Sequence, residues 1–170
     1  MTADVSFGDR DYVIVLLALL LARALDFFST WVATPNLVLE GNPIARKLGW
    51  RLGIVVNGGT CLVLAFWPLA GIIVVTTSLL VAARNFKSAW MMRSMGEDRY
   101  LVFMLNQMSV TPRSLLLVCL LGETLLMAAI GAALLAFSGV ASVPFAIGAG
   151  FVAYAVAVLF YSCLSLWKAR

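Results

Sequence analysis

Long apolar stretches separated by short polar segments dominate the chain. Five of them have about 20 residues or more, the length at which a helix rising ~1.5 Å per residue crosses ~30 Å of hydrocarbon. They cover residues 12–34, 49–67, 69–91, 113–137 and 143–167. The pattern predicts an all-α fold, a polytopic membrane helix bundle of about five transmembrane helices, forming a single transmembrane domain over residues 1–170. Only Pro68, Ala70 and Gly71 mark a turn between the second and third spans, which we expect to form a tight hairpin.

Composition supports this class of protein. Hydrophobic residues make up 63% of the 170 residues and charged residues 12%, against about 25% charged in soluble proteins. The chain starts with the acidic segment MTADVSFGDRDY, whereas a cleavable secretory signal starts with positive charge, so we expect the first span to be retained. The expected location is a prokaryotic cytoplasmic (inner) membrane.

The basic residues fall mainly into three segments. They are Arg46, Lys47 and Arg51 in the first loop, Arg84, Lys87, Arg93, Arg99 and Arg113 in or beside the third, and Lys168 and Arg170 in the last segment. Five spans place all three segments on one side of the membrane, and the positive-inside rule makes that side cytoplasmic. The N-terminus is then outside and the C-terminus cytoplasmic. Lipid bilayer with anionic headgroups on the cytoplasmic side is an expected partner, and nucleic acid is not.

One interfacial helix is expected between spans three and four. Gly96 should end the preceding helix, and Glu97 and Asp98 suit the positive first turn of a new one. The following residues are apolar around much of the helix circumference, which is typical of a segment lying in the cytoplasmic interface.

Charged side chains interrupt two of the spans. Arg23 and Asp26 lie in the first span and Glu123 in the fourth, where each charge costs roughly 2.5–3.5 kcal/mol on insertion scales. Counted from the cytoplasmic ends, the three lie about 12–16 Å deep and could share one level. Thr30 lies on the same helix face as Arg23 and Asp26, and Asn57 adds a polar group from the second span.

Counting these charges leaves one carboxylate in excess if Arg23 faces both Asp26 and Glu123. An unpaired carboxylate in the membrane is costly, so it should be protonated, hold a cation, or pair with Arg84. A protonated acid suggests proton coupling, a bound cation suggests transport or metal-assisted chemistry, and pairing with Arg84 suggests a structural lock. The competing interpretation is an Arg23–Asp26–Glu123 network that only fixes helix packing.

The first loop adds a second group of polar residues. In the segment E-G-N-P, Glu40 and Asn42 offer hydrogen-bonding groups beside Gly41, which permits tight backbone geometry, and Pro43, which can open a helix. The nearby basic residues either bind a lipid phosphate or serve only as topology determinants. The candidate ligand-binding residues are Arg23, Asp26, Thr30, Glu40, Asn42, Asn57, Arg84 and Glu123, and a metal, if any, would be held by Asp26, Glu40 and Glu123.

A short resemblance covers part of these residues. Asp26-Phe27-Phe28-Ser29-Thr30, followed ten residues after Thr30 by Glu40-Gly41-Asn42-Pro43, resembles a D-x-x-[ST]-T … E-x-N-P pattern in a family of small uncharacterised prokaryotic multi-spanning membrane proteins, a domain of unknown function. The resemblance covers about 20 residues of the chain. It implies that Asp26, Thr30, Glu40, Asn42 and Pro43 belong to one site. It implies no reaction, and Glu123 falls outside it.

Several kinds of chemistry are excluded by the residues present. The chain has no histidine, so it has no H-E-x-x-H zinc helix and no histidine haem ligand, and we expect neither haem nor zinc. It has no G-x-x-x-x-G-K-[ST] phosphate loop and no G-x-S-x-G nucleophile turn. Cys61, Cys119 and Cys163 lie in three different apolar stretches without C-x-x-C spacing and are expected to be small buried apolar residues.

Three functions follow from the pattern. The favoured one is a small membrane protein that binds or transports a cation, proton or small polar ligand at a carboxylate-bearing site in the cytoplasmic half of the bundle. The second is an accessory subunit of a larger membrane complex, or a homo-oligomer, docking through alanine repeats such as Ala149, Ala153 and Ala157. The third is a lipid-phosphate-directed membrane enzyme. An enzyme therefore stays among the hypotheses, but it is less favoured than a protein without catalytic activity.

Overall fold

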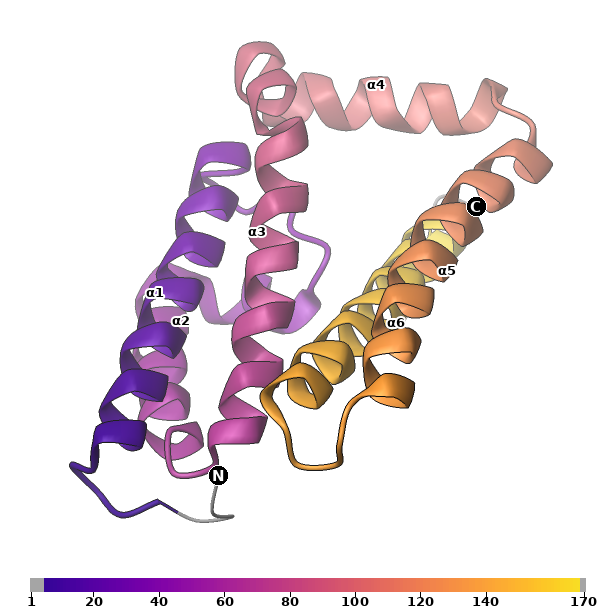
Figure 1. The fold of residues 1–170 in the computed structure, drawn as a ribbon. Coiled ribbons are helices and arrows are strands. Elements are labelled where there is room, and N and C mark those ends of the chain that lie inside the picture. Colours follow the sequence, from indigo (N-terminus) through magenta and orange to yellow (C-terminus); the bar gives the residue numbers. More distant parts are fainter. Residues whose placement is uncertain (1–4, 169–170) are drawn as a thin grey trace.

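The computed structural model describes residues 5–168, with side chains to residue 164, as six helices joined by short connections (Figure 1). The helices are α1 Arg10–Ala33, α2 Pro43–Leu64, α3 Pro68–Met95, α4 Glu97–Val110, α5 Arg113–Phe137 and α6 Val143–Lys168. No strand occurs in the described range. The all-α prediction is therefore confirmed.

Four segments are long and apolar enough to cross a membrane. They are α1, α3, α5 and the Val143–Leu164 part of α6, with mean hydropathies between 1.7 and 2.2. They coincide with the first, third, fourth and fifth predicted spans to within a few residues. The chain thus has the helices of a membrane protein, while the number of crossings and their direction stay predictions.

The predicted second span, residues 49–67, corresponds to the part of α2 that follows Gly49. α2 itself begins earlier, at Pro43, because the Asn42 side chain accepts hydrogen bonds from the backbone N–H of Ile44 and Ala45 and so caps the helix. At Gly49 the backbone leaves the helical conformation, with φ of 65°, a region that glycine adopts without strain. The continuous part after this break has about 15 residues and a length of roughly 22 Å, less than the ~30 Å of hydrocarbon.

The helices pack in sequence rather than around one centre. α1 packs on α3, α3 on α6, and α6 on α5, whereas α2 has few contacts with α1 and α3. Glycines allow the closest of these approaches: a Cβ atom at Gly131 of α5 would lie 2.7 Å from the carbonyl oxygen of Gly148, and one at Gly150 of α6 would lie 2.6 Å from Thr76 Cβ. These tight α5–α6 and α3–α6 contacts fix two of the helix pairs that surround the candidate site.

The expected interfacial helix is α4. Gly96, with φ of 81°, ends α3 and begins α4, and Figure 1 shows α4 lying across the ends of α3 and α5. The N-terminal end of the described chain and the α5–α6 connection lie at the opposite end of the molecule. The helix and its position in the chain are confirmed, and its placement at a membrane surface stays a prediction.

Candidate functional site

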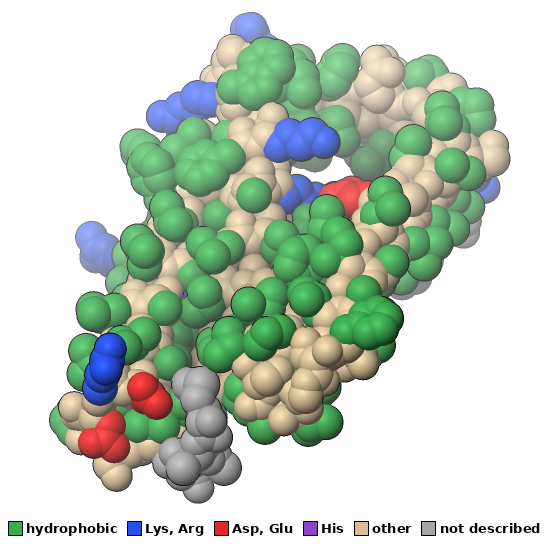
Figure 2. All heavy atoms as spheres, in the orientation of Figure 1, with side chains coloured by type: hydrophobic (Ala, Val, Ile, Leu, Met, Phe, Trp, Pro, Cys, Tyr) green, Lys and Arg blue, Asp and Glu red, His purple; other side chains and the backbone are tan. Residues whose placement is uncertain are grey.

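A cleft of about 870 Å³ lies between the first three helices and the α5–α6 pair, with α4 contributing side chains to its wall. All of the polar residues that the sequence singled out line it: Arg23, Asp26, Thr30, Glu40, Asn42, Asn57, Arg84 and Glu123. Figure 2 shows acidic and basic side chains inside a hollow beneath α4, between α3 and α5. The structure brings the predicted residues together, and their binding of a ligand stays a prediction.

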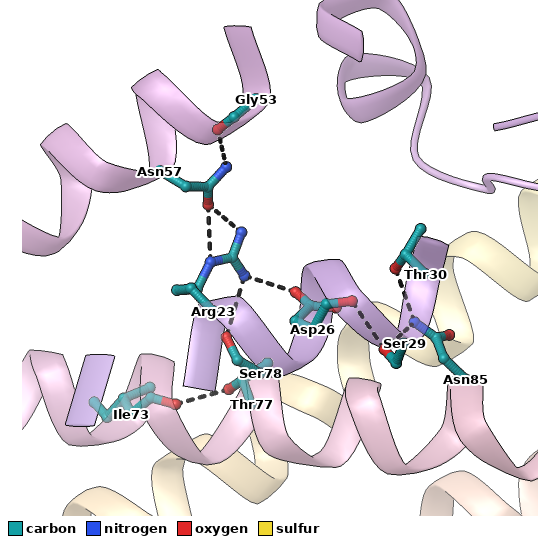
Figure 3. A network of polar contacts seen from close by, with 10 residues as sticks. All are labelled: Arg23, Asp26, Ser29, Thr30, Gly53, Asn57, Ile73, Thr77, Ser78 and Asn85. Carbon is teal, nitrogen blue, oxygen red and sulfur yellow. Dashed lines mark hydrogen bonds and ion pairs between the residues drawn. The ribbon is translucent and has the colours of Figure 1, made fainter. Parts of the chain in front are cut away.

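Arg23 connects three helices on one wall of this cleft (Figure 3). Its Nη1 atom lies 2.9 Å from Asp26 Oδ2 and donates a hydrogen bond of 3.1 Å to Ser78 Oγ of α3. Its Nε atom donates to Asn57 Oδ1 of α2 at 2.8 Å, and Nη2 donates to the same oxygen. Because α2 has few other contacts with its neighbours, this guanidinium is a principal polar link between α2 and the rest of the bundle.

Amide side chains extend the network along the same wall. Asn57 donates to the carbonyl oxygen of Gly53 at 2.7 Å, which orients its own oxygen toward Arg23. On α3, Asn85 donates to Ser29 Oγ at 3.2 Å and to Thr30 Oγ1 at 3.1 Å. The amide groups of Asn57 and Asn85 therefore both have partners, as required where water is scarce.

The competing interpretation, a network of Arg23, Asp26 and Glu123, holds for Arg23 and Asp26 but not for Glu123. Glu123 of α5 pairs instead with Arg84 of α3, at 3.0 Å between Oε1 and Nη1. The reason is geometric. α1 packs on α3 rather than on α5, so the Arg23 guanidinium donates hydrogen bonds to side chains of α2 and α3 instead of reaching α5. The Arg84 and Glu123 side chains are 39% and 41% exposed, against 28% and 15% for Arg23 and Asp26. Of the outcomes left open by the sequence, pairing with Arg84 is the one observed.

Glu40 is the acidic residue of the cleft that has no basic partner. Its Oε1 atom accepts a hydrogen bond of 2.7 Å from the backbone N–H of Asn42. In the part of the chain with described side chains, only Asp26 and Glu123 form ion pairs. Glu40 lies near enough to Asp26 for their charges to interact. The E-G-N-P segment thus contributes two features. Asn42 caps α2, and Glu40 adds a carboxylate without an ion-pair partner to the cleft that holds Arg23 and its hydrogen-bond partners.

The three acids do not form a metal site of the expected kind. Among the described residues, no three histidine, cysteine, aspartate or glutamate side chains are grouped closely enough to hold a metal ion. Asp26 and Glu123 each bind a guanidinium, and they come from helices on opposite sides of the cleft. The conditional assignment of a metal to Asp26, Glu40 and Glu123 gains no support from this geometry and stays a prediction.

Aromatic side chains lie next to the charged group. Phe27 and Trp50 both line the cleft, with ring centroids 6.1 Å apart in an edge-on arrangement. The Arg23 guanidinium carbon lies 5.9 Å from the centroid of Phe27, and the Trp50 Nε1 atom donates to the carbonyl oxygen of Pro35 at 2.8 Å. Aromatic faces of this kind attract cations.

Glu97 fastens α4 to the connection that follows α1. Its carboxylate accepts hydrogen bonds from Thr34 Oγ1 at 2.6 Å, from the Asn36 backbone and side chain at 2.9 and 3.0 Å, and from the Val38 backbone at 3.0 Å. Burial acts to raise the pKa of Glu97, but these hydrogen bonds outweigh it and hold the pKa below its ordinary value. Met104 and Met108 of α4 line the cleft, so Glu97 also positions part of its wall.

Comparison with known proteins gives no relative. No protein-family model, no curated protein and no solved structure matches the chain. The resemblance of the D-x-x-[ST]-T … E-x-N-P segment to a family of small membrane proteins stays a prediction.

Sequence reasoning missed several residues of the site. Ser78 and Asn85, seven positions apart, lie on the face of α3 that bonds to α1, and a search for polar residues at helical spacing could have found them. Trp50 lies in the first turn after the Gly49 break, which the apolar pattern did not reveal. The role of Glu97 had no signal, because its partners, two backbone N–H groups and two side chains, lie about 60 residues earlier in the chain.

Proposed function

We propose that this protein binds a small organic cation in the cleft. Two guanidiniums and three carboxylates line the cleft, and each guanidinium is paired with one carboxylate. The remaining charge is the carboxylate of Glu40, and this single observation carries the proposal. A bound cation would neutralise the charge and would lie beside the aromatic rings of Phe27 and Trp50.

The same pairing argues against a phosphate ligand and hence against the lipid-phosphate enzyme. A phosphate would have to displace Asp26 from Arg23 or Glu123 from Arg84, while meeting the negative charge of Glu40. The first-loop basic residues Arg46, Lys47 and Arg51 are exposed and do not line the cleft. They suit contact with anionic headgroups instead.

The proposal includes the direction of insertion. If the α1–α2 connection and α2 together return the chain across the membrane, in addition to the four long apolar helices, the N-terminus lies outside and the basic segments lie on the cytoplasmic side of a cytoplasmic membrane. The cleft then belongs to the cytoplasmic half of the bundle, near α4. Transport of the cation would further require the cleft to open toward the other side.

Removing the free charge should weaken cation binding. Tetramethylammonium is the probe, titrated calorimetrically into the protein in dodecyl maltoside. We expect Glu40→Gln to lower its affinity by about tenfold, equivalent to ~1.4 kcal/mol, because the cation loses its counter-ion while the shape of the cleft is kept.

Asp98→Asn is the matched control. Asp98 is exposed on α4, does not line the cleft and forms no ion pair in the described part of the chain. Its replacement changes the net charge of the protein by the same amount and should leave the affinity unchanged. Equal losses in both variants, or binding of inorganic phosphate in preference to tetramethylammonium, would refute the proposal.

A further inference from the structure

The cleft has an opening at the side of the helix bundle. α5 makes its helix contacts mainly with α6, and α3 makes its own with α1 and α6. The Arg84–Glu123 pair spans the space between α3 and α5. Figure 2 shows the hollow opening on this face beneath α4, with hydrophobic side chains over much of the surrounding surface. α3 and α5, the helices on either side of the opening, are both candidate membrane spans.

The two walls of the cleft differ in chemistry. The wall from α1, α2, α3 and their connection carries most of the polar groups, including both guanidiniums and the free carboxylate of Glu40. The wall from α4, α5 and α6 contributes Glu123, Tyr154, Tyr161 and Ser162 but is otherwise apolar, with Met104, Met108, Leu116, Leu120 and Val158. A ligand that fills both walls must have a charged end and a hydrocarbon part.

The size of the cleft agrees with such a ligand. Its volume of about 870 Å³ lies within the range of roughly 300–1,000 Å³ that is typical of sites for drug-sized molecules. An ammonium group of four methyls beside Glu40 would leave the apolar wall uncovered. A hydrocarbon tail would cover it and remove that apolar surface from water.

We infer that the ligand is an amphipathic cation, an ammonium group carrying one hydrocarbon tail, which reaches the cleft from the bilayer through the opening between α3 and α5. This inference rests on the proposed function and adds the tail and the route. The ammonium group lies at Glu40 and the tail lies along Met104, Met108 and the α5 side chains.

The test is a series of alkyltrimethylammonium ions with butyl, hexyl and octyl tails, compared with tetramethylammonium. Each is titrated into the protein in dodecyl maltoside, and empty micelles supply the correction for partitioning. A buried methylene multiplies an affinity by roughly three- to fourfold, so we expect the corrected affinity to rise at least tenfold from tetramethylammonium to the octyl compound. Glu40→Gln should weaken every member of the series.

Tail contacts are tested separately from the charge. The double variant Met104→Gln/Met108→Gln keeps the side-chain length on α4, and we expect it to lower octyl binding at least threefold without changing tetramethylammonium binding. Leu105→Gln is the control, since Leu105 is on the same helix, is 46% exposed and does not line the cleft. It should leave both affinities unchanged.

The outcomes separate the two proposals. Equal affinities across the series, or no effect of the double methionine variant, overturn the amphipathic ligand while the cation site stands. Absence of binding by every cation overturns both. Octyl sulfate binding as tightly as octyltrimethylammonium shows a tail site without the proposed charge preference and also overturns both.

Discussion

Arg23→Leu should destabilise the protein by about 3 kcal/mol or more. The substitution leaves the Asp26 carboxylate without its counter-ion and removes the bonds to Asn57 and Ser78. Breaking one partner of a buried ion pair typically costs about 3–5 kcal/mol, and we take the lower end because the Arg23 side chain is 28% exposed. The free energy of unfolding in mixed detergent micelles measures the effect.

The companion variant Arg23→Leu/Asp26→Leu separates lost pairing from lost packing. It removes both charges, and we expect it to recover more than half of the lost stability, since apolar replacement of a whole buried pair is often neutral. Arg99→Leu is the control for loss of one arginine, because Arg99 is exposed on α4 and does not line the cleft. If Arg23→Leu unfolds like the unmodified protein, Arg23 does not hold the helices together as described.

Glu97→Gln should cost about 2 kcal/mol at pH 7 and much less in acid. The Glu97 carboxylate accepts four hydrogen bonds, and bonds to a charged group contribute roughly 1.5–3 kcal/mol, less where water reaches them. Because the folded-state pKa is lowered, this stability is present above the unfolded pKa of about 4.3 and is lost as pH falls through the folded pKa. Unfolding curves of the unmodified protein and of Glu97→Gln, recorded between pH 7 and pH 3, measure how far their free energies of unfolding approach each other in acid.

Asp98→Asn again provides the comparison, since Asp98 neighbours Glu97 in the first turn of α4 but accepts no side-chain hydrogen bond in the described part of the chain. It should leave the unfolding curve nearly unchanged. A loss in Glu97→Gln that is the same at pH 3 and pH 7 would contradict an ionised carboxylate holding the α1–α2 connection.

The long apolar helices could be predicted from sequence because hydrocarbon allows an apolar segment few conformations other than a helix. A chain that crosses hydrocarbon must satisfy every backbone group internally, so each apolar stretch reports a helix directly. Gly96 and Glu97 likewise mark a helix boundary by local chemistry alone. The polar residues of the cleft were found by the same reasoning, because Arg23, Asp26 and Glu123 are costly anywhere but at a shared polar site.

The pairing within the cleft could not be predicted, because it depends on which helices pack together. By depth alone Glu123 shares a level with Arg23, while Arg84 would have to reach it from the cytoplasmic side. The packing of α3 between α1 and α6 nevertheless decides for Arg84. The non-helical backbone at Gly49 could not be predicted for a different reason, since a glycine is also compatible with a continuous helix.

Cysteine labelling tests the central claim, an accessible cleft with a net negative charge, most directly. Cys119 lines the cleft, whereas Cys163 is exposed outside it, and Cys61 is buried. Cys163→Ser and Cys119→Ser therefore leave one exposed cysteine each as the reporter. The measurement is the ratio of labelling rates for a trimethylammonium and a sulfonate methanethiosulfonate. We predict a ratio at least fivefold higher at Cys119 than at Cys163, falling toward the Cys163 value in Glu40→Gln. Equal ratios at the two cysteines, unchanged by Glu40→Gln, would contradict the account.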